Sequence, residues 1–279
     1  MSNYQTYFIA GPENILPNHL LGSESNEEAL IRIVRELANY GLSVFQLRAK
    51  TISEYKQIDI LRDLKKALKN THTQICINDS VSIASKAGEF IDILHLGQSD
   101  MKPEKAKTSI NKNIKIGLSI TKESQINSIP DCVDYIGVGP IYKTNSKDDA
   151  DKPIGEIVLQ QIIQKVDIPI VAIGGINLQN VGNLMKLGVA GVAVISNILN
   201  NQKPLDNFLM LKEKIEKDWR LDILITGGTS GLGYYTALKL AEDHRNKILL
   251  IGSNSAKGIK ATKKLESITR NNKISYLEA

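Results

Sequence analysis

Short apolar runs rich in β-branched residues alternate with amphipathic segments along most of the chain. The runs are Thr6–Ala10, Leu42–Leu47, Gln74–Asn78, Ile93–Leu96, Ile114–Ile120, Tyr135–Gly139, Ile168–Ile173 and Gly191–Ile195. Many are apolar at consecutive positions, as is typical of parallel strands covered on both faces. Glu27–Asn39, Ser53–Leu68 and Leu178–Leu187 have helical periodicity. Eight β/α units predict a TIM (β/α)8 barrel, with a doubly wound open sheet as the alternative.

The character of the sequence changes near Trp219. Leu221–Ile225 has strand character, a glycine-rich turn follows, and Tyr234–Asp243 and Lys247–Ile251 continue the pattern as a helix and a strand. This order is typical of the opening β-α-β unit of a nucleotide-binding fold, but the segment is too short for a complete doubly wound domain. We therefore expect a barrel domain at residues 1–217 and a truncated Rossmann-like segment at residues 218–279.

Charge and composition narrow the classes of function. The net charge is +5, and the residues from Asp218 onward carry ten basic against six acidic side chains. The barrel region is therefore nearly neutral, and no pattern predicts a nucleic-acid module. No apolar run is long enough to span a membrane. The N-terminus lacks signal-peptide character, and Cys76 and Cys132 are expected to be free thiols, so we expect a cytoplasmic protein.

Polar residues follow the second predicted strand at alternate positions. Gln46, Arg48 and Lys50 should share one face because side chains alternate along a strand. Two cations and an amide at a strand end could hold a diphosphate. The alternative is a solvated edge strand with scattered charges.

Two carboxylates follow the next two predicted strands. Asp79 and Asp100 should meet above the barrel, since the loops after parallel barrel strands form the active site of this fold. Carboxylate ligands suit Mg²⁺, which keeps several waters and bridges to substrate phosphates. The alternative for Asp79 is to cap the helix that starts near Ser80.

The remaining strand ends predict a second anion site. Ser119 ends the fifth strand. The second anion site is predicted at strands six to eight, where the loop after the sixth strand contains Thr144, Ser146 and Lys147, which could wrap a phosphate or form a plain surface loop. Residues after strands seven and eight commonly bind phosphate in this fold, and here they include Gly175, Ile195 and Ser196. Two anion sites in one barrel indicate a transferase that expels diphosphate.

The motifs that surround these residues closely resemble thiamine-phosphate synthase. They are Gln-Leu-Arg-x-Lys, Ile-Asn-Asp, His-Leu-Gly-Gln-x-Asp-Met, Gly-Pro-Ile-Tyr-x-Thr-x-Ser-Lys and Ala-Ile-Gly-Gly-Ile-Asn, in this order, and the resemblance covers about residues 4–215. It implies that a pyrimidine diphosphate loses diphosphate with the help of Mg²⁺. A thiazole phosphate then captures the pyrimidinylmethyl cation, which yields thiamine phosphate.

The resemblance also implies roles for individual residues. Asp79 and Asp100 would hold Mg²⁺, and Arg48, Lys50 and Lys147 would neutralise the departing diphosphate. The side chains expected to orient the pyrimidine are Gln46, Asn78 and Ser119. The groups expected to hold the thiazole phosphate are Thr144, Ser146, Gly175, Ile195 and Ser196.

The C-terminal segment resembles the start of a short-chain dehydrogenase/reductase. Gly227, Gly231 and Gly233 match the cofactor turn of that family, but Gly252-Ser253-Asn254 lacks the residue that usually reads the ribose. The segment could bind NAD(P), pair with a protein partner, or be a relic of a gene fusion, which we favour.

One rival enzyme class is a thiazole tautomerase of the related barrel family, which needs neither metal nor diphosphate. The retention of Lys50, Asp79, Asp100 and Lys147 argues against it. The expected partners are small-molecule substrates, with no nucleic acid and no membrane, and a homo-oligomer is possible.

Overall fold

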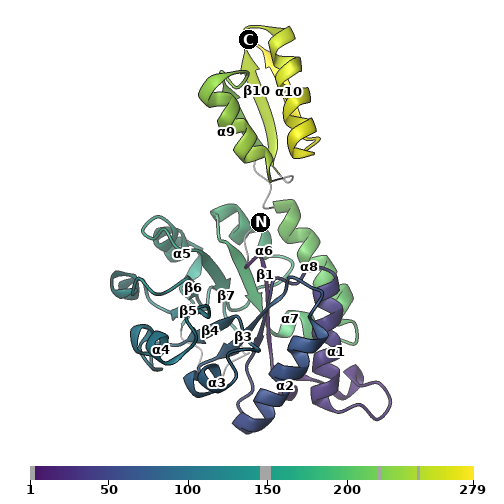
Figure 1. Ribbon diagram of the computed structural model, residues 1–279, viewed down its shortest axis with the longest axis vertical. Coiled ribbons are helices and arrows are strands. Elements are labelled where there is room, and N and C mark those ends of the chain that lie inside the picture. Colours follow the sequence, from purple (N-terminus) through teal and green to yellow (C-terminus); the bar gives the residue numbers. More distant parts are fainter. Residues whose placement is uncertain (1–3, 145–151, 219–221, 244–245) are drawn as a thin grey trace. The chain divides into compact units, whose positions relative to one another are not determined.

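The computed structural model describes residues 4–144, 152–218, 222–243 and 246–279, and all statements below concern these residues. The chain divides into two compact units, one that ends at Ile215 and one that spans Glu216–Ala279. Figure 1 labels many of the helices and strands of both units.

The larger unit is a closed parallel barrel in which each strand pairs with the next along the chain. Its strands are β1 (Thr6–Ala10), β2 (Val44–Leu47), β3 (Gln74–Asn78), β4 (Ile93–Leu96), β5 (Lys115–Ile120), β6 (Tyr135–Val138), β7 (Ile170–Ile173) and β8 (Gly191–Val194). The barrel closes where β1 pairs with β8, with Thr6 opposite Val192 and Phe8 opposite Val194. The TIM barrel prediction is therefore confirmed, and the open-sheet alternative is wrong.

Most crossovers between the strands contain α-helices, which lie outside the barrel in Figure 1. The helices are α1 (Asn26–Asn39), α2 (Glu54–Ala67), α3 (Val81–Lys86), α4 (Pro103–Ser109), α5 (Gly155–Ile163), α6 (Val181–Leu187), α7 (Ser196–Leu199) and α8 (Pro204–Asp218). Between β5 and β6 the described crossover is a 3-10 turn, η3 (Glu123–Ser128). None of the described helices combines the length and apolar character needed to cross a bilayer.

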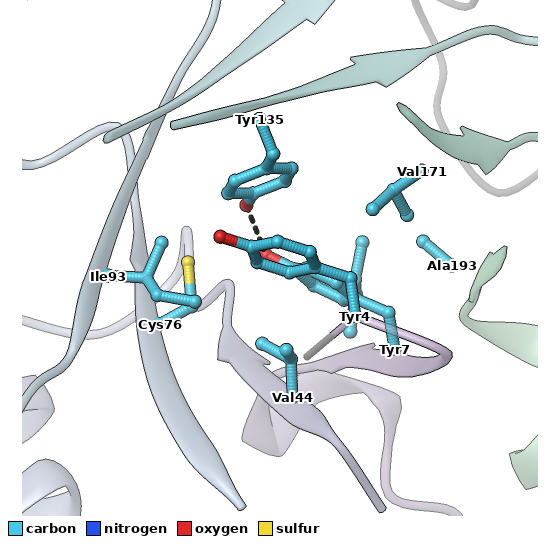
Figure 2. Packing of buried hydrophobic residues seen from close by; sticks show 9 residues of the cluster. Tyr4, Tyr7, Val44, Cys76, Ile93, Tyr135, Val171 and Ala193 are labelled. Atoms are coloured by element: carbon cyan, nitrogen blue, oxygen red, sulfur yellow. Dashed lines mark hydrogen bonds between the residues drawn. The ribbon is translucent and has the colours of Figure 1, made fainter. Parts of the chain in front are cut away.

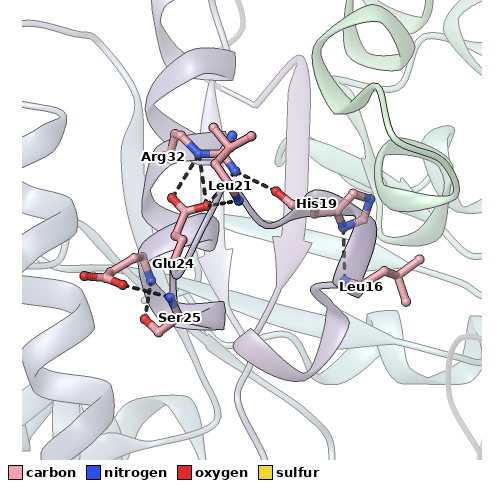
Figure 3. Close-up of polar contacts among 7 residues, drawn as sticks. Leu16, His19, Leu21, Glu24, Ser25 and Arg32 are labelled. Atoms are coloured by element: carbon pink, nitrogen blue, oxygen red, sulfur yellow. Dashed lines mark hydrogen bonds and ion pairs between the residues drawn. The ribbon is translucent and has the colours of Figure 1, made fainter.

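The segment that leads from β1 to α1 contains two 3-10 turns, η1 (Pro12–Asn14) and η2 (Pro17–His19), and is held by polar contacts (Figure 3). Ser25 caps α1, because its Oγ accepts from the backbone N–H of Glu28 while the Glu28 carboxylate accepts from the Ser25 N–H. Arg32 pairs with Glu24 at 2.9 Å and donates to the His19 carbonyl at 2.7 Å. These contacts fix the long loop beside the mouth of the barrel.

The predicted start of β2 at Leu42 is two residues too early. The backbone N–H of Leu42 donates to the carbonyl of Leu37 in the last turn of α1, and Gly41 adopts φ +91°. Leu42 therefore belongs to the helix C-terminal turn, which glycine allows to adopt a left-handed conformation.

The smaller unit is a three-stranded parallel sheet in the order β11-β10-β9, formed by β9 (Asp222–Thr226), β10 (Lys247–Gly252) and β11 (Ile274–Glu278). Two helices, α9 (Gly231–Ala241) and α10 (Ser255–Thr269), connect the strands. One apolar cluster joins Ala237 and Ala241 of α9 to Leu250 of β10 and Leu265 of α10. The expected β-α-β opening of a Rossmann fold is present.

Candidate active site

A cavity of about 430 Å³ lies at the carboxyl ends of the barrel strands. It is lined by every predicted site residue of the barrel that the structure describes, namely Gln46, Arg48, Lys50, Asn78, Asp79, Asp100, Ser119, Thr144, Gly175, Ile195 and Ser196. Ser146 and Lys147 lie outside the described residues. Residues from all eight strand ends thus converge on one space, as expected for this fold.

The three polar residues of the predicted clamp differ in their surroundings. Gln46 is only 2% exposed and its Nε2 donates to the Tyr7 hydroxyl at 2.9 Å, whereas Arg48 is half-buried and Lys50 exposed. Within the described chain, neither cationic side chain makes an ion pair or a hydrogen bond. Their backbones are held, since the Arg48 N–H donates to the Ala10 carbonyl and the Lys50 N–H donates to the Glu13 carboxylate. The two cations are therefore available to an anion in the cavity.

The edge-strand alternative for this region is wrong. β2 pairs with β1 on one side and with β3 on the other, and a closed barrel has no edge. The strand itself ends at Leu47, so Arg48 and Lys50 belong to the loop that follows. Their charged side chains therefore lie at the mouth of the barrel and do not belong to a solvent-exposed strand face.

Asp79 does not cap the helix that follows it. Ser80 is the N-cap of α3, because its Oγ accepts from the backbone N–H of Ile83 at 3.2 Å. Asp79 instead adopts φ +62°, a left-handed conformation that is uncommon for residues other than glycine. Its backbone N–H donates to the carbonyl of His95 at 2.8 Å, which ties the end of β3 to β4. A strained carboxylate residue at a strand end points to a functional constraint.

Asp100 lies in the turn after β4. Its Oδ2 accepts from the backbone N–H of Gly97 at 2.6 Å, and the Asp100 N–H donates back to the Gly97 carbonyl at 3.3 Å. This turn fixes the carboxylate at the cavity wall beside the end of β3. No group of three or more His, Cys, Asp or Glu side chains with metal-binding geometry occurs in the described part of the chain. Asp79 and Asp100 remain the pair of carboxylates that lines the cavity.

Glycines shape the opposite side of the cavity. Gly174 and Gly175 follow β7 with φ +98° and +65°, which only glycine adopts readily. A Cβ at Gly175 would lie 2.6 Å from the carbonyl oxygen of Lys143, and the Tyr142 N–H donates to the Gly174 carbonyl at 3.0 Å. The glycines thus let the loop after β6, which carries Thr144, pack directly on the loop after β7.

The groups after β8 lie beside this glycine pair in the cavity wall. The strand ends at Val194, and the single-turn helix α7 begins at Ser196. Ile195, predicted as the last strand residue, is instead the residue that precedes this helix. A short extra helix near the end of the eighth strand is a usual part of phosphate sites in TIM barrels.

Sequence reasoning missed a buried polar chain that also lines the cavity. The hydroxyl oxygens of Tyr7 and Tyr135 lie 2.8 Å apart (Figure 2), and the Tyr135 hydroxyl lies 2.8 Å from His95 Nδ1. His95 Nε2 is 2.9 Å from the Ser119 hydroxyl. Both tyrosines resemble ordinary core aromatics in the sequence, and only barrel closure brings β1 and β6 to β4. The histidine at a strand end was the one signal that could have revealed this chain.

Burial raises the pKa values of three side chains in and next to this polar chain. It raises the pKa of Tyr7 and of Tyr135 well above the ordinary value of 10.0, so both hydroxyls keep their protons at neutral pH. Burial likewise raises the pKa of the neighbouring Cys76 thiol from 9.0 to about 12. The cavity lining is therefore uncharged at Tyr7 and Tyr135, and so is the neighbouring thiol, whereas Arg48, Lys50, Asp79 and Asp100 are the ionic side chains of the lining.

The glycines predicted to bind a dinucleotide lie in the turn between β9 and α9 of the smaller unit. Gly227 and Gly231 have φ +66° and +56°. A Cβ at Gly233 would lie 2.5 Å from the Gly227 carbonyl oxygen, so the first turn of α9 packs closely on the end of β9. This is the packing for which such glycines are needed in dinucleotide-binding turns.

Comparison with known proteins gives a consistent result. The sequence model of the family described as thiamine monophosphate synthase matches residues 19–198. The chain is 34% identical over 216 residues to a thiamine-phosphate synthase of Lactococcus lactis subsp. cremoris (strain SK11), covering 76% of this chain and 95% of that protein. It is 36% identical over 198 residues to a thiamine-phosphate synthase of Staphylococcus epidermidis (strain ATCC 35984), with coverages of 69% and 87%.

A solved structure agrees with these relatives. Thiamine phosphate pyrophosphorylase from Pyrococcus furiosus superposes with a TM-score of 0.66 at 28% identity, covering 78% of this chain and 98% of that one. The family match ends before the smaller unit begins at Glu216. On the strength of its sequence, its closed barrel and its strand-end motifs, the chain belongs to the thiamine monophosphate synthase family.

Proposed function

We propose that the barrel joins a pyrimidine diphosphate to a thiazole phosphate, forming thiamine phosphate and releasing diphosphate. One observation carries this proposal: two carboxylates, two cations without protein partners in the described chain and a glycine-lined loop face the same cavity. That combination suits a site that holds one diphosphate group and one monophosphate group at once. Membership of the thiamine monophosphate synthase family supports the identity that we propose for the two substrates.

The donor set fits Mg²⁺. Asp79 and Asp100 offer only hard oxygen ligands from adjacent strand ends, and Mg²⁺ is usually held by one or two carboxylates together with waters and substrate phosphates. When bound, Mg²⁺ would offset the negative charge that develops on the diphosphate. We propose these two residues as its protein ligands.

The chain's own cations would share that task. Arg48 presents a planar guanidinium that can bind two phosphate oxygens at once, and Lys50 adds a compact charge at the mouth. Lys147 is proposed to add a third charge. Because the charge on the diphosphate grows as the bond breaks, these groups would stabilise the transition state more than the bound substrate.

The other proposed roles rest on position in the cavity, except that of Ser146, which lies outside the described residues and is assigned from the sequence. Gln46, Asn78 and Ser119 lie on the side of β2, β3 and β5, where the pyrimidine would be oriented. Thr144, Ser146, Gly175, Ile195 and Ser196 are proposed to hold the thiazole phosphate. In this proposal the thiazole nitrogen would lie beside the carbon from which diphosphate departs, so the protein would supply orientation and electrostatics and no nucleophile.

The test is the release of diphosphate from the pyrimidine substrate with Mg²⁺, measured with and without thiazole phosphate and compared with the formation of thiamine phosphate. We expect Mg²⁺-dependent formation of both products in equal amounts by the wild-type protein, and a loss of at least about 100-fold in Asp79→Asn. Isomerisation of a thiazole carboxylate without diphosphate release would support the tautomerase alternative instead.

For the smaller unit we propose that it is dispensable for this reaction, with residues 1–217 as the synthase domain and 218–279 as a relic segment. A protein that ends at Lys217 should retain the wild-type rate, and a large loss would show that the segment contributes. Titration of the full chain with NAD(H) and NADP(H) should show no tight binding at Gly227, Gly231 and Gly233. Both cysteines are unpaired thiols, which fits the reducing cytoplasm that we propose as the location.

A further inference from the structure

Five side chains form a continuous hydrogen-bonded chain across the interior of the barrel, here called the relay. In order they are Gln46, Tyr7, Tyr135, His95 and Ser119, with successive separations of 2.9, 2.8, 2.8 and 2.9 Å. They come from β2, β1, β6, β4 and β5, and all five line the cavity. Figure 2 shows the central pair of hydroxyl groups. The proposed reaction gives the two tyrosines no role.

The hydroxyl protons of the two tyrosines can be traced along the relay. Each tyrosine has one proton to donate, and Gln46 Nε2 donates to Tyr7. If Tyr7 donates to Tyr135, the Tyr135 proton goes to His95 Nδ1, a strong acceptor at 2.8 Å. In the reverse direction the Tyr7 proton would be left with the sulfur of Cys76, a weak acceptor. The first direction therefore gives both tyrosine protons an oxygen or nitrogen acceptor.

This direction determines what Ser119 can do. With Nδ1 accepting, the proton of the neutral imidazole lies on Nε2, which donates to the Ser119 hydroxyl oxygen at 2.9 Å. The Ser119 proton then has no acceptor on His95 and is directed elsewhere. The Ser119 carbonyl accepts from Gln98 Nε2 at 2.6 Å, which also fixes the backbone at this position. Ser119, which lines the cavity, thereby keeps its proton for another acceptor.

Two strand glycines provide the space that this arrangement needs. A Cβ at Gly117 would lie 2.3 Å from Tyr135 Cζ and 2.5 Å from His95 Nδ1. A Cβ at Gly137 would lie 3.1 Å from His95 Cε1. Glycine inside a strand weakens the strand and often marks the close approach of another group. Here that group is the His95–Tyr135 pair.

We propose that Tyr7 and Tyr135 are positioning residues that hold His95 in its Nε2–H form, so that Ser119 donates a hydrogen bond to an acceptor atom of the heteroaromatic ring in the cavity. The assignment of that ring rests on the proposed function. A hydroxyl whose direction is fixed before the substrate binds needs no reorganisation during the reaction, which is how preorganised donors contribute to catalysis.

The first experiment observes the relay without substrate. Nitrogen-15 NMR of histidine-labelled protein at neutral pH, with His95 assigned by its absence in His95→Gln, should show the proton on Nε2 and an acceptor at Nδ1. In Tyr135→Phe the chemical shift of His95 Nδ1 should move toward the value of an imidazole nitrogen that accepts no hydrogen bond. A wild-type His95 protonated on Nδ1, or one unaffected by Tyr135→Phe, would overturn the proposal. This result does not depend on the identity of the reaction.

The second experiment connects the relay to turnover. Tyr135→Phe should lower kcat about 10- to 100-fold with a smaller change in KM, and Tyr7→Phe should have a weaker effect because it lies one bond further from His95. Tyr4→Phe is the matched control, since the Tyr4 ring stacks on Tyr135 at 4.5 Å but is not a member of the relay. Circular dichroism of each variant should match that of the wild type.

A double-mutant cycle separates positioning from simple structural damage. If Tyr135 acts through Ser119, Ser119→Ala together with Tyr135→Phe should be no slower than Ser119→Ala alone. Losses that multiply would show that Tyr135 acts independently, and the positioning role would be rejected. If the wild-type protein lacks synthase activity, the NMR result still tests the relay, so failure of the reaction and failure of the relay remain distinguishable.

Discussion

The substitution Gly117→Ala provides a quantitative test of how tightly the barrel interior is built. The new Cβ would lie 2.3 Å from Tyr135 Cζ, whereas ordinary contacts begin at 3.4 Å, so the ring would have to move by about 1.1 Å. Tyr135 is fully buried, and its hydroxyl is held by Tyr7 and His95, so moving the ring would also disturb these hydrogen bonds. Overpacking of this kind costs about 1–3 kcal/mol, and the depth of this overlap places Gly117→Ala at the upper end, about 3 kcal/mol.

Gly137→Ala is the matched control, because it makes the same change on the neighbouring strand against the same histidine. Its Cβ would lie 3.1 Å from His95 Cε1, which is only slightly closer than an ordinary contact of 3.4 Å, so a small shift of the imidazole ring can relieve the overlap. We expect a cost below about 1 kcal/mol there, partly offset by the reduced freedom of alanine in the unfolded chain. Urea unfolding followed by circular dichroism should therefore separate the variants by about 2 kcal/mol at an unchanged m-value. Equal midpoints would refute the tight packing around the His95–Tyr135 pair.

Three further predictions concern charge, strain and pH. Arg48→Met should reduce diphosphate release by at least about 100-fold while changing the unfolding free energy by less than about 0.5 kcal/mol, because its head group has no protein partner within the described chain. Ser80→Ala should destabilise the barrel by about 1 kcal/mol, because α3 loses its N-cap. Asp79→Asn should cost little stability, because asparagine tolerates the left-handed backbone, but it should abolish the activation by Mg²⁺. A large loss of stability in Asp79→Asn with Mg²⁺ activation retained would show that Asp79 is structural. Burial raises the pKa of the Cys76 thiol from 9.0 to about 12, so its contribution to stability is fully present below pH 9 and is lost as pH rises toward 12. The urea midpoint should therefore fall between pH 9 and pH 12 less steeply in Cys76→Ala than in the wild type. Equal slopes of the midpoint against pH in the two proteins would contradict the raised pKa.

Much of the barrel could be predicted because its strands are continuous apolar runs. Strands such as Gln74–Asn78 and Ile93–Leu96 begin and end where the sequence predicts. The errors occur at boundaries where hydrogen bonding overrides composition, as at Leu42, which the end of α1 retains. The β5–β6 crossover is a further case, since its described part forms a 3-10 turn where a β/α unit predicts an α-helix.

The candidate site was predictable to the extent that it consists of residues that follow strands. Parallel strands bring their carboxyl ends together, so Arg48, Asp79 and Asp100 could be assigned to one cavity from order alone. The relay could not be predicted from the sequence. The hydrogen bond between Tyr7 and Tyr135 joins residues 128 positions apart and depends on the side-chain geometry inside the closed barrel. The roles of the predicted residues in catalysis stay predictions.

The pairing of β1 with β8 has a consequence for synthesis of the chain on the ribosome. The first strand to emerge must wait for the eighth, because Thr6 and Phe8 find their second partners only at Val192 and Val194. Until then the growing chain exposes the unpaired edges of an open sheet, which favour association with other chains. The described residues after Glu216 add no strand to the barrel, and the whole segment is translated after β8. They therefore give the barrel time to close while its C-terminal end is still attached to the ribosome.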